Sequence, residues 1–169
     1  PLKKLLIVED DITMQESIME LIQEDNIEIR KSSTGAEALE ILKEEAFDCM
    51  ILDLGLSDMT GYQLLQKIGK KDSSSKMPVI IYTGKELSRQ EEEQLQTYSD
   101  RIIIKGVKSP ERLLAETTLF LHQVESNLPK AKQQMLRKMN TPSDVMKDKS
   151  ILIVDDDMRN VFALTSLLE

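Results

Sequence analysis

The sequence predicts an open α/β fold, in which a parallel sheet of five strands carries helices on both faces. Strand-like and helix-like segments alternate from the first residues onward, which is the order expected for a parallel sheet. The strand-like runs are mostly continuous in apolar residues, as strands covered on both faces require. Four of these runs end in a polar or charged residue, so polar groups are expected to gather at one edge of the sheet.

The first half of the chain contains three strand-like segments, each followed by a helix-like segment. Residues 5–9 and 48–53 are apolar runs, whereas residues 27–31 alternate between apolar and polar side chains, which favours a strand near the sheet edge. Thr34 and Glu37 have the spacing of a helix-capping box. The expected apolar helix stripes are Met14, Ile18, Leu21 and Ile22, then Ala38, Leu39, Ile41 and Leu42, then Leu64, Leu65 and Ile68.

The next part of the chain continues the alternation with two more strands and two more helices. Residues 78–83 and 101–105 are mostly apolar and are expected to be the fourth and fifth strands. Residues 87–97 are highly charged, which indicates a solvent-facing helix. Ser109 followed by Pro110 predicts a helix start, with a capping serine and a proline in the first turn. The buried stripe expected on this last helix is Leu113, Thr117, Phe120, Leu121 and Val124.

Composition excludes several classes of protein. Apolar residues make up 40% of the chain and charged residues 31%, and the net charge of −8 argues against nucleic acid as a direct partner. No apolar stretch approaches the ~20 residues that span a bilayer, and no signal peptide is visible before the first strand. We therefore expect no direct membrane contact and a cytoplasmic location. The single cysteine, Cys49, excludes an intrachain disulfide and is expected to be a buried, inert thiol.

Charge divides the chain into segments. Residues 1–126 carry 15 basic and 24 acidic residues and are expected to form one domain. Residues 127–149 carry six basic and two acidic residues, and they are interpreted as a basic, partly helical linker with a short helix over Lys130–Met139. A solvated linker that lies against an acidic domain is the simpler interpretation of this segment. A docking segment for a partner is the alternative.

The start of the chain is repeated at its end. Residues 149–169 align with residues 3–23 at a constant offset of 146, and seven of the 21 pairs are identical. Asp155 and Asp156 stand where the first copy has Glu9 and Asp10. Residues 150–169 are therefore interpreted as the truncated start of a second domain, and the chain as a piece of a longer tandem protein. Because one strand and one helix bury too little surface, we expect this segment to join a sheet edge or to exchange with a second molecule, giving a homodimer.

The polar residues at the strand ends predict one small pocket. Glu9 and Asp10 end the first strand, Asp53 the third, Thr83 the fourth and Lys105 the fifth. Carboxyl ends of parallel strands meet at one edge, where ligands of open α/β sheets bind. Two carboxylates 4 Å apart repel by about 4 kcal/mol at an effective dielectric constant of 20, so the cluster needs a cation. An all-oxygen site with few protein ligands suits Mg²⁺.

Such a pocket has a defined chemistry. A carboxylate beside a divalent cation and a lysine can attack phosphorus in line, which makes Asp53 the candidate nucleophile and Lys105 the charge-stabilising group. The hydroxyl of Thr83 can bond a phosphoryl oxygen, and the product is an aspartyl phosphate. The lone histidine, His122, falls on the last helix of the predicted domain rather than at a strand end, so zinc is not expected.

These residues resemble the receiver domain of two-component response regulators. The acidic segment 8–11, the loop 53–61, the pair Thr83-Gly84 and Lys105 are similar to the motifs of that family, and the resemblance covers residues 1–126. It implies a flavodoxin-like, doubly wound (βα)5 sheet. It also implies that Asp53 takes a phosphoryl group from the phosphohistidine of a histidine kinase or phosphotransfer domain and slowly hydrolyses it. The Mg²⁺ ligands implied are Asp10 and Asp53 directly, Glu9 through water and the backbone carbonyl of Gly55.

The chain departs from the family pattern at three positions. Gly106 follows the lysine where the family usually has proline, Ile102 replaces an aromatic switch residue, and Ser57 replaces a proline in the phosphoacceptor loop. Tyr98 and Tyr82 are the candidate substitutes for the aromatic switch, although strand alternation sends Tyr82 to the opposite face from Thr83. None of the departures removes a catalytic group. They are therefore expected to affect the signalling output of the domain more than its phosphorylation.

Three functional hypotheses follow. Tandem receivers joined by a basic helical linker resemble the carboxyl-terminal part of a hybrid sensor histidine kinase, a transferase in which the neighbouring receiver is a partner within the same chain. The alternative is a receiver-like interaction module that acts independently of phosphorylation. An aspartate-nucleophile phosphatase of the dehalogenase type is disfavoured, because it needs a second aspartate at the position of Gly55.

Overall fold

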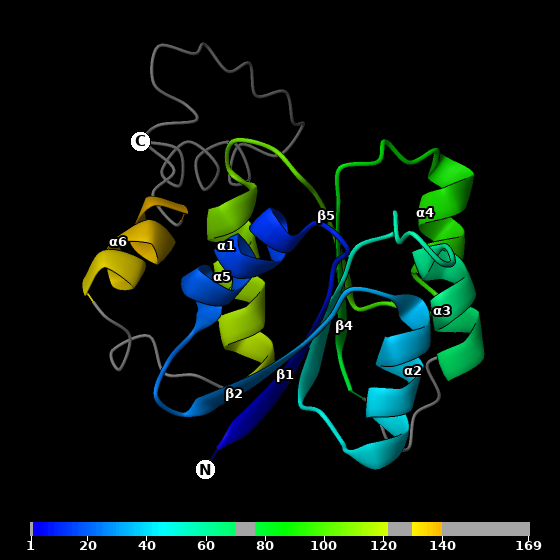
Figure 1. Cartoon of the computed structure of the whole chain (residues 1–169). Coiled ribbons are helices and arrows are strands. Elements are labelled where there is room, and N and C mark those ends of the chain that lie inside the picture. The colour runs from blue at the N-terminus through cyan, green and yellow to red at the C-terminus, as the bar shows by residue number, and fades with distance from the viewer. Residues whose placement is uncertain (1, 70–76, 122–129, 140–169) are drawn as a thin grey trace, which may run out of the picture. The chain divides into compact units, whose positions relative to one another are not determined.

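A five-stranded parallel sheet forms the centre of the computed structural model, which describes residues 2–69, 77–121 and 130–139 (Figure 1). The strands are β1 (Lys3–Val8), β2 (Ile27–Ser32), β3 (Cys49–Leu52), β4 (Val79–Thr83) and β5 (Arg101–Ile104). Their order is β2-β1-β3-β4-β5, so β2 lies at one edge and the direction of winding reverses between β1 and β3. The predicted parallel α/β sheet and the edge position of β2 are confirmed, and the strand bounds differ from expectation by at most two residues.

Helices cover both faces of the sheet (Figure 1). They are α1 (Ile12–Ile22), α2 (Gly35–Glu44), α3 (Gly61–Ile68), α4 (Arg89–Leu95) and α5 (Ser109–Phe120). A further helix, α6 (Lys130–Met139), follows them in the chain. Leu5 and Ile7 pack with α1 and α5 on one face, whereas Leu6 and Val8 pack with α2 and α3 on the other. This alternation follows from the period of two along a strand, and it explains why the strands are apolar on both sides. Cys49 belongs to this core, and burial raises the pKa of its thiol, in agreement with the expected inert thiol.

Helix starts differ from the sequence expectation in detail. The Thr34 hydroxyl does accept a hydrogen bond from the Glu37 amide at 3.2 Å, but the Glu37 carboxylate accepts from Ser33 and Ser32 rather than closing a capping box. Complete capping boxes occur instead at α3, between Thr60 and Gln63, and at α4, between Ser88 and Glu91. Glu91 also binds Lys85 at 2.8 Å, and these hydrogen bonds lower the pKa of its carboxyl to about 2. Both boxes satisfy amides that a helix cannot satisfy internally.

Ser109 is not the cap of α5, contrary to expectation. Lys108 precedes the helix without a side-chain hydrogen bond, and Ser109 is its first residue. The buried Ser109 hydroxyl instead lies 2.9 Å from the Tyr82 hydroxyl, donates to the Gly106 carbonyl at 2.8 Å and accepts from the Gly106 amide at 3.0 Å. This serine therefore ties the loop after β5 to β4.

The helix expected over Lys130–Met139 is present as α6, with those bounds. The chain divides into two compact units, 1–136 and 137–169, and the structure describes only residues 137–139 of the second. Within the first unit, Leu136 is buried in the core on the α1 and α5 face, and Lys132 donates to the carbonyl of Gln23 at 2.8 Å and pairs with Glu24.

Several expectations concern residues that lie outside the described ranges. They are the second copy at 150–169 with Asp155 and Asp156, together with His122 and Val124. In the part of the chain that the structure describes, every helix is too short or too polar to cross a membrane.

Candidate functional site

The carboxyl ends of the strands bring the expected site residues to one edge of the sheet. Glu9 and Asp10 follow β1 directly, and Asp53 follows β3, on either side of the point where the strand order reverses. Backbone hydrogen bonds extend the pairing beyond the strands, from the Asp53 amide to the Val8 carbonyl at 2.9 Å and from the Lys105 amide to the Thr83 carbonyl at 2.8 Å. The predicted convergence of these strand ends is therefore present.

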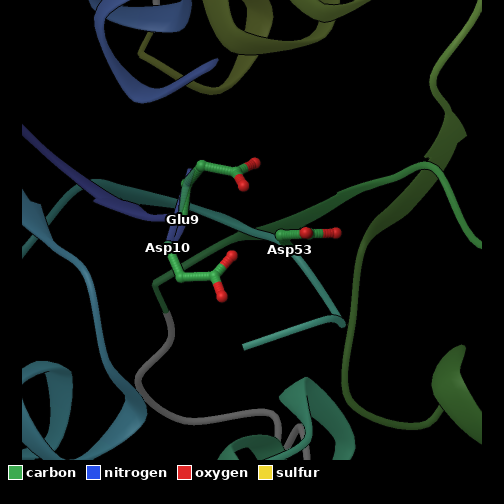
Figure 2. Close-up of side chains that lie close together, drawn as sticks. All are labelled: Glu9, Asp10 and Asp53. Atoms are coloured by element: carbon green, nitrogen blue, oxygen red, sulfur yellow. The ribbon is translucent and has the colours of Figure 1, made fainter. Parts of the chain in front are cut away.

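Three carboxylates face one another in this pocket (Figure 2). One oxygen from each of Glu9, Asp10 and Asp53 lies within 4.8 Å of the other two. Glu9 is only 2% exposed and Asp53 9%, so their charges are shielded poorly by water. Oxygen donors so close together, with Asp10 at the accessible side, fit a hard divalent cation such as Mg²⁺.

Lys105 supplies a positive charge to the pocket. Its Nζ donates to Glu9 Oε2 at 2.8 Å and lies 3.6 Å from Asp53 Oδ2. Burial raises the pKa of the Glu9 carboxyl, while the hydrogen bond and the charge of Lys105 oppose that rise. One ammonium does not balance three carboxylates, so the pocket retains an attraction for a further cation.

Thr83 ends β4 beside the loop that carries Lys105. It is 1% exposed, and its Oγ accepts a hydrogen bond from the Lys85 amide at 3.2 Å. Because the oxygen is used as an acceptor, the hydroxyl proton is left to donate to another oxygen. Tyr82 packs on the opposite face, as expected, with the Nζ of Lys105 5.5 Å from its ring centroid.

The aromatic position of the family is filled by an aliphatic side chain. Ile102 is half-buried against the core that contains α3 and α4. In the same core, the rings of Tyr62 and Tyr98 meet edge to face with centroids 5.7 Å apart. Tyr82 is buried and its hydroxyl contacts that of Ser109, whereas Tyr98 is half-buried and contacts the ring of Tyr62.

Sequence reasoning missed two residues whose side chains hold backbone segments next to the pocket. Gln15 is 5% exposed, and its side-chain amide donates to the carbonyls of Glu9 and Ser32, both at 3.1 Å. Its spacing of three and seven residues from Ile18 and Ile22 places it on the buried face of α1, a signal that was available in the sequence. The other missed residue, Asp58, binds backbone amides of residues 35 and 36, for which no local pattern exists.

The loop between β3 and α3 is closed tightly behind Asp53. The Gly61 amide donates to the Leu54 carbonyl at 2.9 Å, and the Leu54 amide donates to Asp53 Oδ1 at 2.8 Å. A Cβ on Gly61 would lie 2.7 Å from the Asp53 carbonyl oxygen and 2.8 Å from the Leu54 Cα. The glycine thus allows the helix start to approach the backbone that carries the candidate nucleophile.

We expect the substitution Gly61→Ala to lower the free energy of unfolding by about 1–3 kcal/mol, because its methyl group meets backbone atoms that cannot rotate away. The matched control is Gly106→Ala. Nothing lies within 4 Å of its added Cβ, and its backbone is outside the left-handed region, so we expect a change between zero and a gain of about 1 kcal/mol. Urea denaturation measures both, and equal stability of the two variants would refute the close approach at Gly61.

Comparison with known proteins agrees with this geometry. The family model described as response regulator receiver domain matches residues 5–118. A probable transcriptional regulator, ycf29 of Pyropia yezoensis, is 34% identical over 86 residues, which are 51% of this chain and 39% of the relative. The transcriptional regulatory protein SrrA of Staphylococcus aureus is 26% identical over 160 residues, 95% of this chain and 62% of the relative. The chain therefore spans less than two thirds of the length of these relatives.

Solved structures share the fold. The crystal structure of a CheY-like response regulator receiver domain protein from Methanospirillum hungatei has a TM-score of 0.61 and 28% sequence identity. Its match covers 73% of this chain and 96% of that one. The receiver domain of DrrB, activated by BeF3, has the same TM-score and 27% identity, over 73% of this chain and all of that one.

Proposed function

This chain belongs to the response regulator receiver domain family, and from that premise we propose that it accepts a phosphoryl group from a phosphohistidine onto Asp53. The observation that carries the proposal is the pocket itself, in which carboxylate oxygens of Asp53, Glu9 and Asp10 lie within 4.8 Å of one another and Asp53 Oδ2 lies 3.6 Å from Lys105 Nζ. The proposed metal ligands are Glu9, Asp10, Asp53 and the backbone carbonyl of Gly55.

The two oxygens of Asp53 have different roles in this proposal. Oδ1 accepts the Leu54 amide, which fixes the rotation of the carboxylate. Oδ2 faces Lys105, and we assign the attack to it. The new bond joins Oδ2 to phosphorus, while the bond from phosphorus to the imidazole nitrogen breaks and its electron pair stays on the nitrogen, which is then protonated. Attack by water on the same phosphorus later releases phosphate and restores Asp53.

The neighbouring groups stabilise charge on the transferred group. The ammonium of Lys105 is already positioned between two carboxylates, where it can bind a phosphoryl oxygen without large movement. The Thr83 hydroxyl can donate to another phosphoryl oxygen. When bound, Mg²⁺ would offset the negative charge that the carboxylates and the phosphoryl group bring together.

The experiment is phosphorylation by a small phosphodonor. We expect the chain to gain the mass of one phosphoryl group on incubation with acetyl phosphate and Mg²⁺, and to gain none when a chelator removes the metal. Intact-mass spectrometry measures the product. An unmodified chain under both conditions would instead favour the phosphorylation-independent interaction module, for which the aliphatic Ile102 is the supporting observation.

The larger protein is a further part of the proposal. The repeat of residues 3–23 at 149–169 supports a second receiver, and we propose a cytoplasmic hybrid histidine kinase in which this neighbour is an intrachain partner. The curated relatives carry the names of transcriptional regulators, which makes an output in transcription the competing assignment. A kinase core and a complete second set of site residues in the whole gene would support the hybrid kinase, and a DNA-binding domain after this receiver would contradict it.

The second copy also supports a prediction of association, by addition to a sheet edge or by exchange between two molecules. Its test is the size in solution of the chain and of the chain truncated after Ser126. A monomer in both cases would contradict exchange.

A further inference from the structure

Asp58 connects two parts of the chain that are far apart in the sequence. It lies in the loop between β3 and α3, and its Oδ1 accepts from the Gly35 amide at 2.8 Å while its Oδ2 accepts from the Ala36 amide at 2.9 Å. These are the first two amides of α2, which have no partner inside the helix. Hydrogen bonds from an amide to a carboxylate are stronger than those between neutral groups. The two bonds therefore hold the loop at Asp58 firmly against the start of α2.

Met59 adds a packing contact beside these hydrogen bonds. A Cβ on Gly35 would lie 2.6 Å from both Cγ and Sδ of Met59, so the loop lies directly against the first turn of α2. On the other side of the loop, the Gly61 amide holds the Leu54 carbonyl. The segment between Leu54 and Met59 is therefore anchored at both ends.

We propose that Asp58 is a positioning residue that keeps the Gly55 carbonyl directed at the metal site by holding this loop on α2. The inference rests on the proposed function, because it assumes that the pocket binds Mg²⁺. Glycine reaches many backbone conformations, so the direction of its carbonyl depends on how its neighbours are anchored. A carbonyl that turns away removes one ligand from the metal, and Asp58 thus sets Mg²⁺ affinity without contacting the ion.

The test is a titration of the full chain with Mg²⁺, in which binding is monitored through the amide chemical shifts in NMR spectra. We expect Asp58→Ala to raise the dissociation constant about tenfold, the size typical for outer partners of metal ligands. Saturating Mg²⁺ should restore the rate of phosphorylation by acetyl phosphate in this variant, because the nucleophile and Lys105 are unchanged. A general loss of structure would not be repaired by added metal.

A second variant removes the contact while it keeps the carboxylate. Ala36→Pro deletes the amide that binds Asp58 Oδ2. Ala36 lies in the first turn of α2, where proline is tolerated. The preceding residue is a glycine, which has no Cβ to clash with the proline ring. We expect its dissociation constant to lie between those of the wild type and Asp58→Ala. The matched charge control is Glu40→Gln on the exposed side of α2, which is expected to bind Mg²⁺ like the wild type.

The outcomes separate this inference from the proposed function. If the wild-type chain shows no saturable Mg²⁺ binding, the metal site and the role of Asp58 both fail. If the wild type binds and Asp58→Ala binds equally well, only the positioning role fails. If Asp58→Ala binds weakly but Ala36→Pro binds like the wild type, Asp58 acts through its charge alone and the role of the anchored loop is refuted.

Discussion

Replacing Asp53 with asparagine is expected to lower the rate of phosphorylation by a factor of about 10³ or more. The side-chain amide is a poor nucleophile, and no bond to phosphorus can form in its place. The fold should remain intact, because the Leu54 amide can still donate to the retained side-chain oxygen and because the loss of one carboxylate relieves repulsion within the pocket. Intact-mass spectrometry after incubation with acetyl phosphate and Mg²⁺ measures the effect.

The control for this substitution is Asp25→Asn. Asp25 is exposed in the turn between α1 and β2, at the edge of the sheet opposite the pocket, and its loss changes the net charge by the same amount. We expect this variant to be phosphorylated like the wild type. Phosphorylation of Asp53→Asn at the wild-type rate would assign the phosphoryl group to another residue.

Replacing Lys105 with methionine is expected to slow phosphorylation about 10²–10³-fold, because the methionine keeps the packing but removes the positive charge that lies 3.6 Å from Asp53 Oδ2. The rate is measured as above, at saturating Mg²⁺ so that a change in metal affinity does not contribute. Lys108→Met is the matched control. It removes an exposed lysine three residues away and should leave the rate unchanged.

The same substitution should change how stability depends on pH. Burial raises the pKa of Glu9, so the folded chain binds this proton more tightly than the unfolded chain. The free energy of unfolding therefore falls as pH rises from the ordinary pKa of a glutamate through the raised value. Without Lys105 the pKa of Glu9 rises further, and the fall should become larger and extend to higher pH. Thermal unfolding without metal measures this, and identical pH profiles for the wild type and Lys105→Met would contradict the ion pair.

Local patterns in the sequence predicted the sheet and the main members of the pocket. The apolar strands that end at Glu9, Asp53 and Lys105 can be recognised from the sequence, because the hydrophobic periods of strands and helices involve residues that are close in the chain. The parallel arrangement then follows from their alternation, and it places these strand ends at one edge. The helix over Lys130–Met139 was predicted with the observed bounds because Pro129 and Pro142 lie on either side of it.

Local reasoning was wrong where a side chain found a partner outside its own element. Ser109 has the sequence of a helix cap, yet its hydroxyl binds Tyr82, a residue 27 positions away. Glu37 has the spacing of a capping box, yet its carboxylate turns to Ser32 and Ser33 at the end of β2. In both cases, a partner outside the helix replaced the one that the local spacing predicted.

The sequence alone determined that five strands alternate with helices, that four of these strands are apolar, and that three carboxylates, a hydroxyl and a lysine stand at strand ends. Only the tertiary structure decided that the winding reverses between β1 and β3, that Lys105 pairs with Glu9 across 96 residues, and that Asp58 binds the first amides of α2. The physical reason is the separation in sequence between the residues that interact. A periodic pattern records which face of one element is buried, whereas a hydrogen bond between distant segments depends on how several elements pack together.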